Sequence, residues 1–240
     1  MTGPRKDELR GAQVLVVGTG PMGRATARRA LDAGANVTLV GRSAGRLAEA
    51  AAGTSGMKTV VADTEQPDQA EELMASGAPW DHVAILAGGV GARASGITRT
   101  TLPEAQRAFA RLWLTYNLLR AAPGTVRAGG SVCVLSGSSG RKPLTGFGVW
   151  GTLHGSLEAL ALSAAVELSP VRVNVVSPGG IGIRMDRQLI PRPGVAEDVA
   201  DMVCALMGNP AVTNAVVDVD GGERLGTYPS PLNSWAALSH

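Results

Sequence analysis

Three glycines near the N-terminus have the type and spacing of a phosphate-binding loop. They form a GxGxxG pattern that follows the apolar run Gln13–Val17 and opens a stretch of helical period. In such a loop the first glycine permits a tight turn, the second lets the backbone approach a pyrophosphate, and the third lets the helix pack on the strand. The helix N-terminus adds amide donors and a partial positive charge. The segment predicts a dinucleotide site formed by Gly18, Gly20, Pro21, Met22 and Gly23. The alternative is a tight turn that binds no ligand.

The residues after the second apolar run bear on which dinucleotide binds. An NAD site usually has Asp or Glu at the end of the second strand, where it holds the ribose hydroxyls. This chain reads Gly41-Arg42-Ser43 there. A guanidinium and a hydroxyl suit a 2′-phosphate, so Arg42 and Ser43 predict NADPH in preference to NADH. The alternative is that Arg42 is a solvated surface arginine.

The elements that must position this loop are short β-branched runs alternating with alanine-rich stretches of helical period. This alternation is typical of βαβ units around a buried parallel sheet. We expect strands at 13–17, 36–40, 57–61, 82–86, 131–135, 172–176 and 215–219, and helices at 22–34, 44–52, 67–75, 103–122, 147–169 and 195–207. The predicted fold is α/β, a single-domain Rossmann fold with a seven-stranded doubly wound parallel sheet and helices on both faces. We expect residues 1–12 to form an N-terminal extension of this domain, and 222–240 a C-terminal tail near the substrate cleft.

Composition excludes several classes of protein. The 240 residues are 45% apolar and 18% charged, with a formal net charge of +2. The arginines are scattered, so nucleic acid is not an expected partner. No apolar run is long enough for a membrane span and the N-terminus does not read as a secretory signal, so we expect a cytoplasmic protein. Cys133 and Cys204 lie in apolar segments without metal-ligand spacing, which predicts reduced core cysteines and no metal site.

Further motifs, spread over nearly the whole chain, resemble the short-chain dehydrogenase/reductase family. Asp63 looks like the family's adenine-contacting aspartate, and Ala87-Gly88-Gly89 stands where the family has Asn-Ala-Gly. The segment 173–179 is similar to the family's turn near the nicotinamide. The resemblance implies that the cofactor also contacts Asp63, Ala87, Gly88, Gly89, His154, Pro178, Gly179, Gly180 and Ile181.

The resemblance does not extend to the family's catalytic residues. In the family a Ser and a Tyr contact the substrate carbonyl, a Lys four residues after the Tyr lowers its pKa, and an Asn on the fourth helix completes a proton relay. Alignment without gaps places Gly137 at the Ser, Trp150 at the Tyr and His154 at the Lys, and counting back from Gly129-Gly130 places Arg111 at the Asn. Asn117 lies too far along the helix to replace the Asn. The chain is therefore most similar to a divergent branch that lacks the catalytic residues.

Four residues in this region are candidates for catalysis: Ser136, Ser138, Trp150 and His154. The serines, with Ser139, could hydrogen-bond a carbonyl or cap a turn. The His154 imidazole could hold the cofactor's ribose, serve as the acid, or simply pack. Trp150 could stack on an aromatic substrate or the nicotinamide, or lie in the core.

Both tyrosines are outside the aligned positions. Tyr116 falls in the long fourth helix, where packing or a subunit interface is expected, and Tyr228 lies in the C-terminal tail. The tail could bring Tyr228 to the substrate cleft, or leave it as a surface aromatic. The walls of that cleft are expected to come from 90–97, 138–149, 180–192 and the tail with Trp235.

These residues favour an NADPH-dependent ketoreductase of a specialised pathway. A bound nicotinamide supplies hydride, and losing general acid catalysis slows such a reaction by about 10²–10⁴-fold without forbidding it. An aromatic ketone flanked by a phenol could supply the proton itself, which suggests an aromatic polyketide or antibiotic such as an angucyclinone. The alternative is a catalytically inactive partner subunit or an NADP(H) sensor. The resemblance also implies a homodimer or homotetramer formed through the helices at 103–122 and 147–169.

Overall fold

A seven-stranded parallel sheet forms the centre of the computed structural model, which describes residues 9–87, 96–184 and 188–226. Every strand pairing is parallel, and the order is β3-β2-β1-β4-β5-β6-β7. The order reverses between β1 and β4, as in a doubly wound sheet. The strands are β1 Gln13–Val17, β2 Asn36–Gly41, β3 Lys58–Val61, β4 Trp80–Ile85, β5 Val126–Leu135, β6 Arg172–Pro178 and β7 Val216–Val219.

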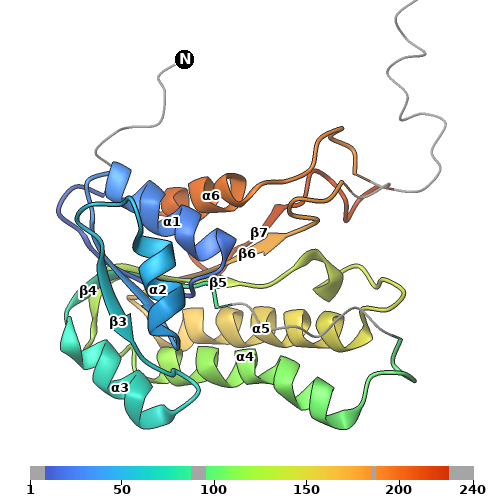
Figure 1. Ribbon diagram of the computed structural model, residues 1–240, viewed down its shortest axis with the longest axis horizontal. Coiled ribbons are helices and arrows are strands. Elements are labelled where there is room, and N and C mark those ends of the chain that lie inside the picture. The colour runs from blue at the N-terminus through green and yellow to red at the C-terminus, as the bar shows by residue number, and fades with distance from the viewer. Residues whose placement is uncertain (1–8, 88–95, 185–187, 227–240) are drawn as a thin grey trace, which may run out of the picture.

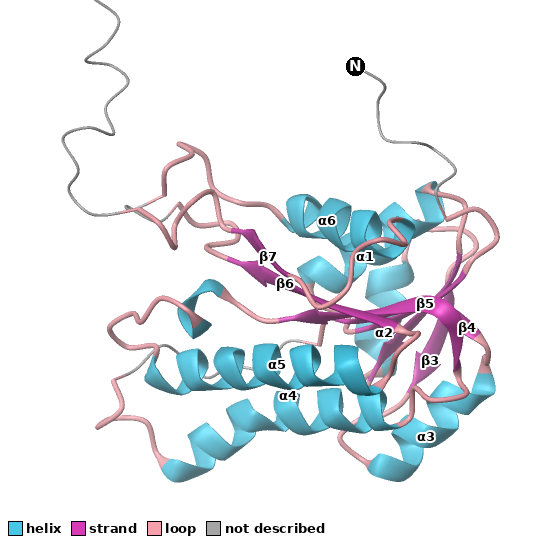
Figure 2. Ribbon diagram, turned by 180° about the vertical axis from the view of Figure 1, so that it is seen from behind, coloured by secondary structure: helices cyan, strands magenta, loops and turns pink. Residues whose placement is uncertain are grey.

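Helices cover both faces of the sheet, which confirms the predicted fold class (Figures 1 and 2). Helices α1, α2 and α6 pack on one face, and α3, α4 and α5 pack on the other. Their bounds are α1 Pro21–Asp32, α2 Ala44–Ala51, α3 Pro67–Ser76, α4 Leu102–Arg120, α5 Gly148–Glu167 and α6 Ala196–Gly208, with a short 3-10 helix η1 Ser138–Gly140.

Two apolar cores, one on each face, explain why the strands read as continuous hydrophobic runs. In β1, Val14 and Val16 pack under α1, α2 and α6, whereas Leu15 and Val17 pack under the other three helices. Successive strand residues point to opposite faces, so a strand buried on both faces needs apolar residues at every position. Cys133 in β5 and Cys204 in α6 are both buried, and no disulfide joins them.

The largest difference from the expected boundaries is at β5, which begins at Val126, five residues before the predicted start at Ser131. Val126 pairs with Trp80, and an irregularity separates this pair from the regular register that starts at His82. This extension could not be predicted from the apolar run, because Gly129-Gly130 precedes that run and glycine weakens strand propensity. Gly130 is needed there, since a Cβ atom would lie 2.5 Å from the carbonyl oxygen of Asp81.

Among the helices in the described ranges, none is long and apolar enough to cross a membrane.

Candidate active site

A cavity of about 370 Å³ opens at the carboxyl ends of β1 and β2, beside the point where the strand order reverses. Ligands of doubly wound sheets bind at this point. Met22 and Gly23 lie in the first turn of α1 and do not line the cavity, and the predicted Gly88 and Gly89 are outside the described residues. The predicted cofactor residues that line the cavity are Gly18, Gly20, Pro21, Arg42, Ser43, Asp63 and Ala87.

The three motif glycines meet different constraints. Gly18 has φ +130°, and a Cβ atom on it would lie 2.7 Å from the backbone nitrogen of Ala87. A Cβ atom on Gly23 would lie 1.9 Å from the carbonyl oxygen of Gly18, so the helix could not approach the strand. A Cβ atom on Gly20 would meet no described atom within 4 Å. Protein packing therefore accounts for Gly18 and Gly23, whereas the space beside Gly20 is open, as a contact with a pyrophosphate would require.

Arg42 forms an ion pair at the rim of the cavity that the sequence did not predict. Its Nη1 donates to Glu65 Oε1 at 2.8 Å, and the two side chains are 52% and 28% exposed. Ser43 caps α2, and its Oγ accepts from the backbone nitrogen of Arg46 at 3.4 Å. A 2′-phosphate bound at Arg42 would have the Glu65 carboxylate as its neighbour.

The loop that carries Glu65 is fixed by hydrogen bonds from two helices. Asn117 of α4 donates through Nδ2 to the carbonyl oxygens of Thr64 and Glu65, both at 3.1 Å. The backbone nitrogen of Asp63 donates to Gln69 Oε1 at 2.8 Å. Asn117 therefore positions the loop at the predicted adenine end of the cavity.

Thr19 leaves no room for a side chain at the end of β2. A Cβ atom on Gly41 would lie 2.6 Å from Thr19 Cγ2, and the β-branched threonine has little freedom to move away. The acidic residue that holds the ribose hydroxyls in NAD sites therefore does not fit at position 41.

A second group of predicted residues meets where β5 leads into η1 and α5. The His154 ring occupies the space next to Gly137, because a Cβ atom on Gly137 would lie 2.5 Å from His154 Cε1. Ser139 Oγ lies 2.9 Å from His154 Nδ1 and fixes the ring. The Trp150 and His154 ring centroids are 6.0 Å apart, with the planes tilted by 36°. The structure thus places Gly137, Trp150 and His154 together, as the alignment implied.

His154 is neutral at physiological pH. Burial lowers the pKa of its imidazole from 6.5 to about 3, and the positive charge of Arg111 adds to this effect. Of the roles considered for His154, that of an imidazolium acid is therefore not supported. A neutral ring can still hold a ribose hydroxyl through a hydrogen bond.

The predicted catalytic serines are buried. Ser136 Oγ donates to Glu158 Oε1 at 2.8 Å, and Ser138 is 6% exposed within η1. Glu158 also pairs with Arg141, whose guanidinium reaches Asp218 on β7. Ser136 thus belongs to a network that ties α5 and the segment after β5 to the last strand.

Arg111, from α4, is 6% exposed and lines the same cavity as the glycine loop. Its Nη2 donates to the carbonyl oxygen of Leu135 at the end of β5. Burial lowers the pKa of the guanidinium to about 10, so it is still charged at neutral pH. A buried positive charge therefore lies between the two groups of predicted residues.

The turn after β6 is fixed by a glutamate that the sequence did not single out. Glu223 is 1% exposed, and its Oε2 accepts from the backbone nitrogen of Gly180 at 3.1 Å. A Cβ atom on Gly179 would lie 2.5 Å from the same oxygen. The predicted Pro178 ends β6, and Gly179, Gly180 and Ile181 lie in this turn; all four are outside the cavity at β1 and β2.

Two of the predicted substrate walls meet, since a Cβ atom on Gly148 would lie 2.5 Å from Ile97 Cγ1. Tyr228, Trp235, and wall residues 90–95 and 185–187 lie outside the described part of the chain. In the described ranges, no group of three His, Cys, Asp or Glu side chains could hold a metal ion.

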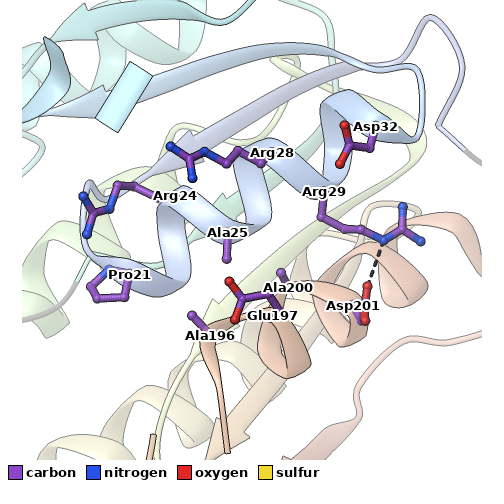
Figure 3. A pocket seen from close by; sticks show the side chains of 10 residues that line it. All are labelled: Pro21, Arg24, Ala25, Arg28, Arg29, Asp32, Ala196, Glu197, Ala200 and Asp201. Atoms are coloured by element: carbon purple, nitrogen blue, oxygen red, sulfur yellow. Dashed lines mark hydrogen bonds and ion pairs between the residues drawn. The ribbon is translucent and has the colours of Figure 1, made fainter. Parts of the chain in front are cut away.

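A groove of about 580 Å³ lies between α1 and α6 (Figure 3). Its lining carries both signs of charge, and Arg29 Nε pairs with Asp201 Oδ1 at 2.8 Å. This ion pair joins α6 to α1, the helix that follows the glycine loop, so these charged side chains of the groove have a structural role.

Comparison with known proteins identifies the family. A family model described as "Enoyl-(Acyl carrier protein) reductase" matches residues 18–223, from the first motif glycine to the buried Glu223. The chain belongs to the short-chain dehydrogenase/reductase family. It is thus an oxidoreductase of a family whose members bind nicotinamide dinucleotides.

Several relatives support this membership. The short-chain dehydrogenase/reductase ATR9 of Stachybotrys chlorohalonatus is 27% identical over 90% of this chain and 98% of its own length. A 3-oxoacyl-[acyl-carrier-protein] reductase of Rattus norvegicus is 35% identical over 44% of this chain and 50% of its own length. The crystal structure of a Brucella melitensis family member, described as a glucose/ribitol dehydrogenase, has a TM-score of 0.82, 26% identity, and coverage of 91% and 98%.

Proposed function

We propose that this short-chain dehydrogenase/reductase is an NADPH-dependent ketoreductase. The observation that carries the proposal is the cavity at β1 and β2, with an open loop at Gly20 and the guanidinium of Arg42 at its rim. Thr19 blocks an acidic residue at Gly41, which removes the usual contact of NAD with a carboxylate at this position. Bound NADPH would supply the hydride. Gly18, Gly20 and the first turn of α1 would hold the pyrophosphate, and Asp63 would face the adenine.

We further propose that the chain belongs to a branch of the family that works without the Ser/Tyr/Lys residues. Gly137, Trp150 and the neutral His154 provide no acid for a developing alkoxide. Reduction then depends on a substrate that carries its own proton, such as an aromatic ketone with a neighbouring phenol. This chemistry suits an aromatic polyketide or antibiotic pathway, of which an angucyclinone is one example. We place the enzyme in the cytoplasm, where NADPH is available.

The experiment compares binding and turnover. Purified protein should bind NADPH more tightly than NADH in a fluorescence titration. With NADPH it should reduce a hydroxyaryl ketone, and the methyl ether of the same ketone should react about 10²-fold more slowly because it has no proton to donate. Equal rates for the two ketones would contradict substrate-assisted protonation.

A catalytically inactive partner subunit or NADP(H) sensor is the second candidate. It is favoured by the buried hydroxyl of Ser136, which is turned toward Glu158, and by the absence of an acid at His154. Tight NADPH binding without reduction of any hydroxyaryl ketone would support this candidate against the ketoreductase.

A further inference from the structure

Arg111 carries a buried charge without a matching anion. Its guanidinium makes one hydrogen bond, to the carbonyl oxygen of Leu135, and no described carboxylate lies within ion-pair distance. Buried charges in proteins are ordinarily paired, because removing a charge from water is costly. Two carboxylates line the same cavity: Glu65 is paired with Arg42, and Asp63 accepts a hydrogen bond from the backbone nitrogen of Glu65. The site therefore has room for an anion that the described residues do not supply.

The position of this charge points to the substrate. Arg111 hydrogen-bonds the last residue of β5, two residues before Gly137, and its charge acts on the His154 imidazole. It also lines the cavity that contains the glycine loop. The guanidinium thus lies between the proposed dinucleotide site and the residues aligned with the family's carbonyl-binding residues.

We propose that Arg111 is the anion-binding group of the substrate site, where it holds the negatively charged oxygen of a hydroxyaryl ketone. This inference rests on the proposed function and adds a residue to it. When hydride from the reduced nicotinamide adds to the carbonyl carbon, the C=O π electrons move to oxygen and form an alkoxide, and the nicotinamide is oxidised. The alkoxide then takes the proton of the neighbouring phenol, which leaves an alcohol and a phenolate.

A fixed cation stabilises both anions that form in this reaction, first the alkoxide and then the phenolate. The negative charge passes between two neighbouring oxygens of one molecule, so a guanidinium beside them stabilises both the alkoxide and the phenolate. Arginine keeps its charge throughout, because even the lowered pKa of Arg111 is about 10. A neutral imidazole at His154 next to this cation avoids a second positive charge in the same buried region.

The test uses 2′-hydroxyacetophenone as a probe with NADP⁺, so that no reduction takes place. Absorbance of the bound phenolate as a function of pH gives the pKa of the bound phenol. Wild-type protein should lower this pKa by about one unit or more, a tenfold preference for the anion. Arg111→Met should return the pKa to that of the free probe, and Arg111→Lys should retain part of the shift. Arg120→Met is the control, because Arg120 lies on the same helix and forms an exposed ion pair with Glu71.

The outcomes separate the two proposals. Folding of Arg111→Met is checked by circular dichroism, and if this variant does not fold, Arg111→Gln takes its place. An unchanged probe pKa in a folded variant overturns the assignment, as does a wild-type protein that binds the probe in neither protonation state. Loss of NADP⁺ binding in the folded variant would assign Arg111 to the cofactor instead. A wild-type protein that lowers the probe pKa but reduces no ketone with NADPH keeps the anion site and rejects the ketoreductase.

Discussion

At the scale of single residues, Gly137 and His154 are sterically matched. Gly137 has φ −179°, which any residue can adopt, so the His154 ring rather than the backbone excludes a side chain there. We expect Gly137→Ser, which restores the family's residue, to lower the free energy of unfolding by about 1–3 kcal/mol through overpacking. Urea denaturation measures this change. The double variant with His154→Ala should recover much of the loss, and a Gly137→Ser protein as stable as wild type would show that the ring moves freely.

Glu65 should control how strongly the protein prefers NADPH. Its carboxylate holds Arg42 at 2.8 Å and would repel a 2′-phosphate, whereas it could accept a hydrogen bond from the 2′-hydroxyl of NADH. We expect Glu65→Gln to strengthen NADPH binding about fivefold at low salt, with no gain for NADH. Calorimetric titration of both cofactors measures this. Glu71→Gln is the control, since Glu71 pairs with Arg120 on the surface; an equal gain in the control would attribute the effect to net charge.

The residues that could be predicted from the sequence are those in contiguous motifs. Gly18, Gly20 and Gly23 were found because the turn, the ligand approach and the helix packing all act within six residues. Glu65 and Glu158 were missed because their partners Arg42 and Ser136 are 23 and 22 positions away. Such pairs depend on which strand ends become neighbours in the sheet, and no local spacing encodes them.

At the scale of elements, a histidine of β4, His82, makes stability depend on pH through its half-buried position beside β5. His82 Nδ1 lies 2.9 Å from Ser131 Oγ, and burial, followed by the charge of Arg172, lowers its pKa from 6.5 to about 4 despite the opposing effect of Asp81. The pKa of His154 is lowered to about 3. Below pH 6.5 the unfolded chain binds protons that the folded protein does not, so acid favours unfolding.

We therefore expect the free energy of unfolding to be highest above pH 6.5. It should fall by about 1.4 kcal/mol per pH unit for each histidine as the pH drops toward 4. Urea titrations at pH 7.5, 6 and 5 measure the slope. His82→Gln should reduce it by about half, because one of the two contributing histidines is removed. A slope that does not change in this variant would mean that other groups cause the acid sensitivity.

The order and type of the elements followed from the hydrophobic pattern, whereas one strand boundary did not. Continuous apolar runs such as Val14–Val17 are unambiguous when both faces of a strand are buried. The start of β5 was missed because Val126 pairs with Trp80 across an irregular register, with Gly129-Gly130 between it and the apolar run. Pairing with another strand, rather than local propensity, determines this boundary.

At the scale of the whole molecule, the sheet brings distant motifs to one edge. The glycine loop follows β1, Arg42 follows β2, and Gly137 follows β5, and all three strands are parallel. Parallel strands end at the same edge, so the α/β pattern alone predicted that these residues lie near one another. It could not predict the buried charge of Arg111, because a helix residue reaches this edge only through the way in which α4 packs on the sheet.

The surface of α4 and α5 leads to a prediction about assembly. Trp113 and Tyr116 lie on α4, three positions apart, and are 58% and 46% exposed, and Val166 on α5 is 70% exposed. The two helices lie side by side on one face of the sheet (Figure 2). Large exposed apolar side chains favour association, because burying them removes apolar surface from water. We propose that this face joins two copies of the chain into a homodimer, or four into a homotetramer.

Trp113→Glu should therefore shift the protein to a monomer, because a buried carboxylate without a partner destabilises an interface. Light scattering after size exclusion measures the mass. Ala75→Glu, at an exposed position on α3, adds the same charge away from this face and should leave the oligomer intact. NADPH binding should persist in the Trp113→Glu monomer, because the cavity at β1 and β2 is lined by residues other than Trp113 and Tyr116. A wild-type protein that is monomeric, or a variant that keeps the wild-type mass, would show that these aromatic side chains do not hold the copies together.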